Sequence, residues 1–296
     1  MAVWARRMRP TACASTSIDM TPQSTASALI LVSGLAHAVV NAILKSGRDK
    51  MSGRALIDGF SALLIAPAIA LVPLPVNAWT WLFGSWVVHA LYLFALIRSF
   101  EQSDMTVAYP IARGLAPMLA ATVAVTVFHE PITVYVAIGI ALIACGVMFI
   151  GVSHTMNRRA LAWAALTGAC IAGYTVIDAQ GVRAAPTAAS YIVWTFVMMG
   201  AGIAAIFAAW RGRAFFAAAA DQWKPGLAAG VLSIVSYGCA LLAFRLGATP
   251  RLAALRETSI LFGTAIAVIF LHERLTRFRY AGVLAIAIGA AALLAG

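Results

Sequence analysis

The feature that most constrains this chain is a succession of apolar stretches, each long enough to cross a lipid bilayer as a helix. The hydrocarbon core of a bilayer is about 30 Å thick and needs about 20 apolar residues per helix. Charges, prolines and glycines separate ten such stretches, which lie near residues 24–44, 55–75, 79–99, 105–128, 133–152, 160–182, 187–209, 225–246, 250–271 and 278–295. The sequence therefore predicts an all-α membrane protein with ten transmembrane helices.

Little of the chain remains for structure outside the membrane. The longest expected connection between helices covers about residues 211–224, which is too short for a soluble domain. Only 10% of the 296 residues are charged, whereas soluble domains are about a quarter charged. The net charge of +11 comes from Lys and Arg at the ends of the apolar stretches. There the lipid bilayer is the expected partner, so we expect no nucleic acid.

The first 23 residues are polar and differ from the rest of the chain. They contain three arginines but no apolar stretch of the kind found in a secretory signal peptide. We expect residues 1–23 to form a disordered tail, with Met20 as an alternative start. The four cysteines have no paired spacing, and this pattern predicts small packing residues with neither a disulfide nor a metal site.

The chain contains an internal repeat. Residues 109–146 align with residues 252–289 at a constant offset of 143. The matched pairs are Arg113 with Arg256, His129 with His272, Glu130 with Glu273, Thr133 with Thr276, Gly139 with Gly282 and Gly146 with Gly289. We infer a duplicated five-helix unit, with a first repeat over 24–152 and a second over 160–296.

Because five is odd, the second repeat is expected to enter the membrane inverted relative to the first. The connections after odd-numbered helices carry thirteen Lys and Arg residues, and those after even-numbered helices carry three. Positively charged connections stay on the cytoplasmic side. The distribution predicts cytoplasmic odd connections, both termini outside, and a multi-pass protein of a bacterial-type inner (plasma) membrane.

Four short motifs carry a family resemblance: AYPIARGLAP at 108–117, HEPIT at 129–133, ALRETS at 254–259 and HERLT at 272–276. With them the chain resembles the EamA family of the drug/metabolite transporter superfamily, from about residue 26 onward. The resemblance implies two inverted five-helix bundles around a central cavity. It also implies a secondary transporter that exports amino acids or similar small metabolites by alternating access.

Polar residues inside the expected helices are the candidates for the substrate site. A charge near the bilayer centre is costly, so such residues usually face the interior of the helix bundle. We list as substrate-binding candidates His89, Tyr92, Tyr109, Arg113, Tyr174, Asp178, Tyr237, Arg256 and Glu257. For the His and Tyr residues, a polar aromatic lining suits an amphipathic metabolite. The alternative for each is an ordinary hydrogen bond between helices.

Arg113 and Arg256 occupy matched positions in the two repeats. A guanidinium group binds a carboxylate or phosphate through two parallel hydrogen bonds, so either arginine is a candidate to hold an anionic substrate group. The alternative is an internal pairing with backbone carbonyls or with Glu257. Pro110 and Pro117 flank Arg113, and we expect them to kink that helix.

Glu257 and Asp178 are the candidates for proton coupling. The alternative for Glu257 is to neutralise Arg113, Arg256 or Lys45. Arg256 and Glu257 are expected to point to different places, since adjacent residues on a helix diverge by about 100°.

Asp178 is also a candidate to bind a substrate amine. It lies near the end of its apolar stretch, with Arg183 close in sequence. A surface ion pair with Arg183 is therefore its alternative role.

Glu130 and Glu273 are expected to be structural. Each ends a helix just before Thr133 or Thr276, which are placed to cap the next helix. We expect each acid to hold the amino end of that following helix. The glycines at 139, 146, 151, 282 and 289 have the spacing of close helix packing.

The leading function is a secondary transporter of a small molecule, which is not an enzyme and carries no cofactor or metal. No ATP-binding motif is present, so an ion gradient or exchange would supply the energy. One alternative is a lipid-carrier flippase of the same superfamily, and a more remote one is a membrane-embedded enzyme. A monomer is plausible because two fused repeats already complete the bundle.

Overall fold

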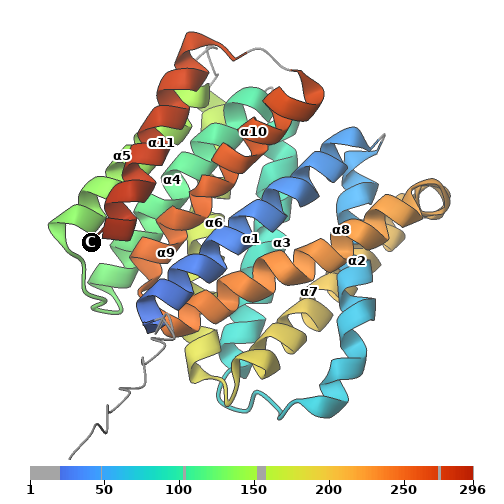
Figure 1. Cartoon of the computed structure of the whole chain (residues 1–296). Helices are drawn as coiled ribbons and strands as arrows, with labels where there is room; N and C mark the ends of the chain where they lie inside the picture. The colour runs from blue at the N-terminus through green and yellow to red at the C-terminus, as the bar shows by residue number, and fades with distance from the viewer. Residues whose placement is uncertain (1–20, 48, 103–104, 152–157, 273–274, 296) are drawn as a thin grey trace, which may run out of the picture.

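The computed structural model describes residues 21–47, 49–102, 105–151, 158–272 and 275–295. All regular structure in these residues is helical (Figure 1). The helices are α1 (Pro22–Ser46), α2 (Lys50–Ile65), η1 (Ala66–Leu71), α3 (Trp79–Gln102), α4 (Met105–Thr126), α5 (Val134–Gly151), α6 (Arg158–Ala184), α7 (Ala188–Arg211), α8 (Arg213–Leu246), α9 (Thr249–Leu255), η2 (Arg256–Thr258), α10 (Ser259–Leu271) and α11 (Arg277–Ala295), where η marks a 3₁₀-helix. The expected all-α class is confirmed.

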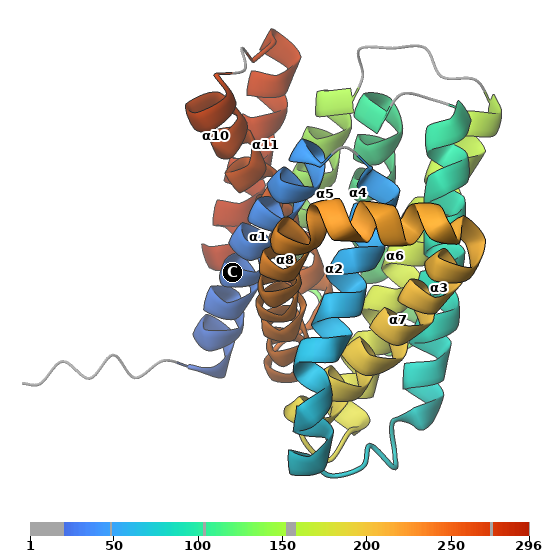
Figure 2. The same ribbon diagram turned by 90° about the vertical axis from the view of Figure 1, so that its right-hand side faces the viewer.

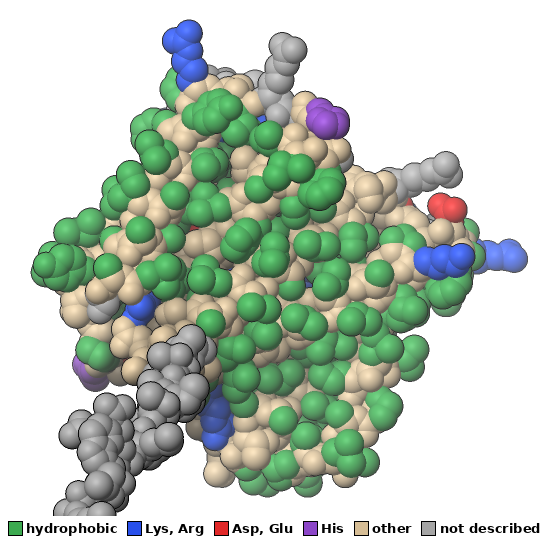
Figure 3. Space-filling model, viewed as in Figure 1, with side chains coloured by type: hydrophobic (Ala, Val, Ile, Leu, Met, Phe, Trp, Pro, Cys, Tyr) green, Lys and Arg blue, Asp and Glu red, His purple; other side chains and the backbone are tan. Residues whose placement is uncertain are grey.

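Eight segments among the described residues are long and apolar enough to cross a membrane. They are Pro22–Ser46, Ser52–Leu71, Trp79–Ser99, Arg158–Ala184, Ala188–Arg211, Ala219–Leu246, Thr249–Phe270 and Arg277–Ala295. Figure 3 shows a face covered mainly by hydrophobic side chains. Soluble proteins do not expose apolar surface on this scale. The chain is therefore a multi-pass integral membrane protein.

Three expected segments differ in detail from the structure. The stretch 55–75 becomes α2 followed by the 3₁₀-helix η1, and 250–271 is divided into α9, η2 and α10. The expected connection 211–224 is helical from Arg213 onward and forms the first part of α8, with Pro225 inside the helix. That connection is rich in alanine, the strongest helix former, which explains the error.

The beginning of α1 falls inside the expected tail, of which residues 1–20 lie outside the described part of the chain. The Thr21 side chain accepts a hydrogen bond from the backbone N–H of Ser24, and Pro22 occupies the first helical position. Both residues are favoured at a helix start. Helix α1 therefore starts at Pro22, two residues earlier than expected.

Close glycine contacts hold α5 against α11, which lie side by side in Figure 1. A Cβ atom added to Gly139 would lie 3.0 Å from the carbonyl oxygen of Gly289, and one added to Gly146 would lie 2.7 Å from that of Gly282. The reverse contacts measure 2.8 Å at Gly289 and 2.5 Å at Gly282. These glycines let the two backbones touch, as their spacing predicts.

The centre of the bundle is where α1, α4, α6 and α9 with η2 meet. Around it α1 packs along α8, α3 along α6, and α2 along α7 (Figures 1 and 2). Helix α4 stays helical through Pro110 and Pro117. The polar residues of these helices are thereby brought to one region.

Two histidines adopt a left-handed backbone conformation. His129 and His272 both have φ of 52°, and no other non-glycine residue in the described ranges has a positive φ. His272 ends α10, and His129 follows α4. The conformation is rare for residues other than glycine, and it recurs at positions that the sequence alignment matches.

Candidate functional site

The Arg256–Glu257 pair lies where the ninth apolar stretch changes its helical geometry. After α9 the chain forms the three-residue 3₁₀-helix η2, Arg256–Thr258, before α10 begins. Arg256 and Glu257 are both buried, with 8% and 3% of their surface exposed. Their side chains reach different helices, as the sequence predicts: Arg256 contacts α8, and Glu257 contacts α4.

Glu257 forms a buried ion pair with Arg113. The Nε atom of Arg113 lies 3.0 Å from Oε2 of Glu257, and both side chains are at most 6% exposed. The N–H is not aimed at the carboxylate, so neither atom has a hydrogen-bond partner and the attraction is electrostatic. Arg113 also donates to the Ser259 hydroxyl at 3.0 Å and lies 5.9 Å from the ring of Tyr109. Glu257 thus neutralises Arg113, which is one of the three basic partners expected for it if it does not carry a coupling proton.

Arg256 has no carboxylate partner within the described residues. Its guanidinium carbon lies 5.0 Å from the centre of the Tyr237 ring, and its Nε atom has no hydrogen-bond acceptor. A cation above an aromatic face is stabilised by roughly 0.5–2 kcal/mol, less than burying an unpaired charge costs. Arg256 is therefore a buried positive charge that forms no ion pair within the described part of the chain.

Asp178 is the corresponding buried negative charge. It is fully buried in α6 and accepts hydrogen bonds from the hydroxyl of Tyr191, at 2.7 Å, and from that of Tyr237. The alternative of a surface ion pair with Arg183 is wrong. Residues five apart on a helix point about 140° apart, and Arg183 contacts Glu130 instead.

The aromatic candidates form one cluster beside Asp178. The His89 ring stacks on Tyr174, with centroids 3.9 Å apart, and lies edge-on to Tyr92 and Tyr237 at 6.5 and 6.2 Å. Nδ1 of His89 is 2.9 Å from the carbonyl oxygen of Ser85. A carbonyl only accepts, so Nδ1 carries the hydrogen and Nε2 is the free acceptor.

Tyr237 connects Arg256 and Asp178. Its ring lies under the guanidinium of Arg256, while its hydroxyl donates to Asp178. A cavity of about 10 Å³ lies beside Arg256, Arg113 and Glu257, with Thr175 also in its wall. One water needs about this much space, so the arrangement is closed around its charged groups.

The arginine–carboxylate pair of α2 was missed by the sequence analysis. Arg54 binds Asp58 through two contacts, Nε to Oδ2 at 3.0 Å and Nη2 to Oδ1 at 2.8 Å. Asp58 is buried, with 7% of its surface exposed. The expected boundary at residue 55 placed Arg54 outside the helix and hid the i, i+4 spacing that favours this pair.

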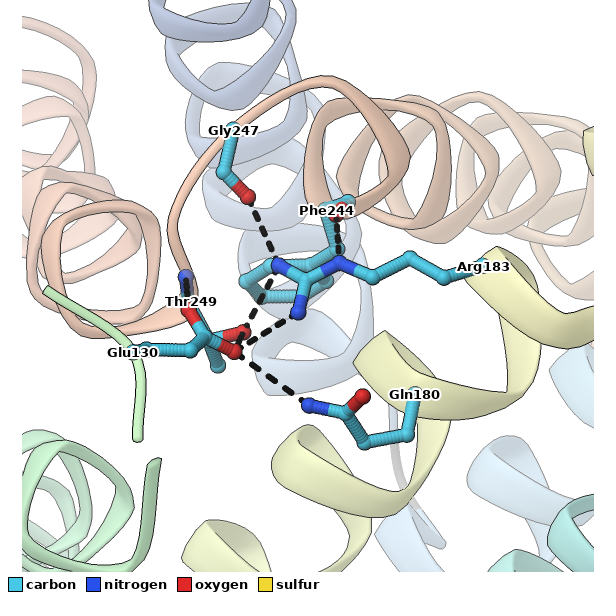
Figure 4. Close-up of polar contacts among 6 residues, drawn as sticks. All are labelled: Glu130, Gln180, Arg183, Phe244, Gly247 and Thr249. Atoms are coloured by element: carbon cyan, nitrogen blue, oxygen red, sulfur yellow. Dashed lines mark hydrogen bonds and ion pairs between the residues drawn. The ribbon is translucent and has the colours of Figure 1, made fainter. Parts of the chain in front are cut away.

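Glu130 lies in a second polar group, which Figure 4 shows and which we call the Glu130 cluster: Glu130, Gln180, Arg183, Phe244, Gly247 and Thr249. Glu130 accepts from Arg183 Nη1 at 2.6 Å, from both the backbone N–H and the hydroxyl of Thr249 at 2.7 Å, and from Gln180 at 3.3 Å. Arg183 donates further to the carbonyls of Phe244 and Gly247. Hydrogen bonds from Arg183 and Thr249 hold the pKa of Glu130 below its ordinary value, although partial burial opposes them.

The expected role of Glu130 needs a correction. Its carboxylate holds the amino end of α9, through Thr249, and not that of α5, which follows it in sequence. Thr133 and Thr276 do cap α5 and α11, since their hydroxyls accept from the N–H groups of Val136 and Arg279 at 3.3 Å. Glu273 lies outside the described residues.

The structure brings the candidate residues together in two connected groups. One contains Arg113, Glu257 and Tyr109, and the other contains Asp178, Tyr237, His89, Tyr92 and Tyr174. Arg256 touches both, through the shared cavity and through Tyr237. Ser259 and Tyr191 complete the groups but were not among the candidates. Tyr191 has no ionisable neighbour in sequence at the spacing of one helical turn that would have set it apart, whereas Ser259 follows Arg256 by three positions, a spacing that could have indicated it.

Comparison with known proteins supplies the family. The model of the EamA-like transporter family matches residues 158–295. One similar solved structure is described only as "Crystal structure of protein". It is 16% identical in sequence and has a TM-score of 0.70, and the match covers 91% of this chain and 96% of the other. This likeness shows the fold alone. No curated protein matches the chain. Residues 158–295 belong to the EamA-like transporter family of the drug/metabolite transporter superfamily, as the sequence motifs indicated.

Proposed function

We propose that this protein is a secondary transporter of a small metabolite that carries a carboxylate, with amino acids as the leading class. The observation that carries the proposal is Arg256, a buried guanidinium beside a cavity with no carboxylate partner among the described residues. A substrate carboxylate bound there would supply the missing negative charge and the missing acceptor at Nε. Membership of the second half in a transporter family supports transport as the activity.

Asp178 is the proposed partner for the other end of the substrate. Its carboxylate is fully buried and receives two tyrosine hydroxyls but no cation from the part of the chain described. A substrate ammonium group, or a proton when no substrate is bound, would neutralise it. Glu257 is the weaker candidate for proton coupling, because Arg113 already compensates its charge.

We propose that transport proceeds by alternating access between two inverted five-helix repeats, over residues 24–152 and 160–296. Two observations support the duplication besides the sequence alignment. The glycine contacts between α5 and α11 are reciprocal, because Gly139 meets the repeat mate of Gly146, and Gly146 meets the repeat mate of Gly139. The left-handed residues His129 and His272 are also repeat mates. In such transporters the substrate lies between the repeats, which rock around it.

Export across a bacterial-type inner membrane is the proposed direction and location. The Lys and Arg bias toward the odd connections supports cytoplasmic odd connections. Among the residues that the structure describes, we find no separate observation at the charged site that favours the lipid-flippase or the enzyme alternative.

The test is a counterflow assay in proteoliposomes loaded with single amino acids or small organic acids, with and without a pH gradient. We expect wild-type protein to exchange at least one carboxylate-bearing compound. Arg256→Gln should lower exchange by at least tenfold while the protein still inserts, and Arg256→Lys should keep part of it. Arg159→Gln, which removes an exposed arginine at the start of α6, is the control. Wild-type exchange by Arg256→Gln would refute the assignment.

A further inference from the structure

A cavity of about 480 Å³ lies between α3 and α7 and meets the candidate site only at His89. It is lined mainly by apolar and aromatic side chains, with one charged pair at an end. The lining residues are Trp86, His89, Ala90, Leu93, Phe94, Ile97, Arg98, Glu101, Met199, Ile203, Ile206, Phe207 and Trp210. Cavities that hold small ligands usually measure about 300–1,000 Å³. This cavity is therefore large enough for a ligand and has the lining of one that binds an apolar group.

The cavity lies beside a close contact between the same two helices. The two helices touch where Gly202 meets the indole of Trp86, since a Cβ on that glycine would lie 2.5 Å from Nε1. By contrast, α2 and α8 pack backbone to backbone, since a Cβ added to Gly230 would lie 3.3 Å from the backbone nitrogen of Ser61. Protein interiors are close-packed, so a space of this size beside tightly packed helices calls for an occupant.

The cavity is open to the side of the bundle where lipid lies. Three of its lining residues are about half exposed or more: Phe94 at 48%, Ile206 at 50% and Trp210 at 62%. Its deep end is formed by His89, which is 7% exposed and stacks on Tyr174. An occupant thus enters laterally between α3 and α7, which are neighbours in Figure 2.

The depth of the cavity matches one leaflet of a bilayer. From Trp86 to Arg98, α3 rises about 18 Å at 1.5 Å per residue, and half of the hydrocarbon core is about 15 Å. The apolar segment of α3 ends at Ser99, and that of α7 ends at Arg211, next to Trp210. Tryptophan and arginine at these ends mark the headgroup level. The cavity therefore runs from the headgroups to about the bilayer centre.

The mouth of the cavity carries one charge of each sign. Arg98 Nη1 lies 3.0 Å from Oε2 of Glu101, and both side chains are about half exposed. The guanidinium of Arg98 also lies 5.3 Å from the ring of Phe94. Guanidinium binds phosphate well, and a carboxylate binds an ammonium group. A zwitterionic headgroup therefore complements this mouth better than an anionic one.

We propose that the α3–α7 cavity is a binding site for a phospholipid with a phosphate-and-ammonium headgroup, of the phosphatidylethanolamine type. One acyl chain lies in the cavity with its end toward His89. The phosphate contacts Arg98, and the ammonium contacts Glu101. The cavity meets the aromatic group of the candidate site at His89, but the lipid assignment does not depend on the identity of the transported substrate.

The test is native mass spectrometry of the purified, delipidated full-length protein. Dioleoyl phosphatidylethanolamine and dioleoyl phosphatidylglycerol are added singly at equal concentration, and retained lipid is counted. We expect one phosphatidylethanolamine per protein, retained at least fivefold more than phosphatidylglycerol. Ala90→Trp in α3 and Ile206→Trp in α7 fill the cavity from opposite walls, and each should lower retention at least fivefold.

Two controls separate the site from general lipid adhesion. Val235→Trp adds the same bulk on an exposed position of α8 outside the cavity and should retain lipid as the wild type does. The double variant Arg98→Gln, Glu101→Gln should lose the preference between the two lipids. Thermal unfolding in detergent establishes that each variant is folded. Equal retention by both cavity-filling variants and the wild type would overturn the site, and equal retention of the two lipids by the wild type would overturn the headgroup assignment.

Discussion

The Glu130 cluster allows a stability prediction worked directly from its contacts (Figure 4). The perturbation is Glu130→Gln, which keeps the size of the side chain and removes its charge. The carboxylate accepts from Arg183, Gln180 and twice from Thr249, with its side chain 10% exposed. In the variant the new amide N–H₂ group faces these donors and cannot accept from them. At least one charge-assisted bond is therefore lost.

The magnitude follows from the strength and exposure of that bond. A hydrogen bond to a charged group contributes about 1.5–3 kcal/mol. The Arg183 side chain is 27% exposed, so solvent screening places the expected loss toward the lower part of this range, at about 2 kcal/mol. We expect the effect to be on the free energy of unfolding, with transport per inserted molecule changed by less than about twofold.

The assay is equilibrium unfolding in mixed detergent micelles, followed by circular dichroism. Glu101→Gln is the matched control, because Glu101 also pairs with an arginine, Arg98, but its side chain is 52% exposed. Such surface pairs contribute about 0–1 kcal/mol. If Glu130→Gln and Glu101→Gln lower the free energy of unfolding by the same small amount, the carboxylate does not hold α9 and the reasoning fails.

Three further predictions follow from the same structure. Folding lowers the pKa of Glu130. Its contribution to stability is therefore fully present above the ordinary pKa of about 4.3 and is lost as the pH falls through the lower pKa of the folded state. In an acid titration, the wild type should lose stability more steeply than Glu130→Gln. Gly282→Ala places a Cβ atom 2.5 Å from the carbonyl oxygen of Gly146 and should destabilise the protein by about 1–3 kcal/mol in thermal unfolding. Gly263→Ala is the control, because its added Cβ meets no atom within 4 Å, and it should stabilise the protein by about 0.5–1 kcal/mol. Arg113→Gln and Glu257→Gln should each lower the free energy of unfolding by about 3–5 kcal/mol, because each leaves a buried charge unpaired. In the same unfolding assay the double variant should lose clearly less than the sum of the two single losses. Additive losses would argue against the ion pair.

The sequence anticipated the ionisable residues of the site better than their partners. Arg113, Asp178, Arg256 and Glu257 are recognisable because charges are rare and costly within apolar stretches. Which acid pairs with which base depends on the rotation and depth of each helix, and periodicity within one helix does not reveal that. The pairing of Glu257 with Arg113, across 144 positions of sequence, is visible only in the folded chain.

The errors have the same origin. Glu130 was expected to serve the next helix because only sequence neighbours are apparent in a motif, yet the backbone N–H that it accepts belongs to Thr249. Asp178 was given a surface alternative because it lies near the end of its apolar stretch, whereas the tertiary structure buries it completely.

By itself the sequence determined that this chain lies in the membrane, that it is helical, and that its second half repeats motifs of the first. These properties depend on local composition and on the need of every backbone polar group in lipid to be bonded within its own helix. Only the tertiary structure decided that Arg113 and Glu257 neutralise each other. It also decided that Arg256 and Asp178, on either side of Tyr237, form no ion pair with any residue that the structure describes. Such compensation depends on distances of a few ångströms between side chains on different helices, because charge pairing in a low-dielectric interior falls steeply with separation.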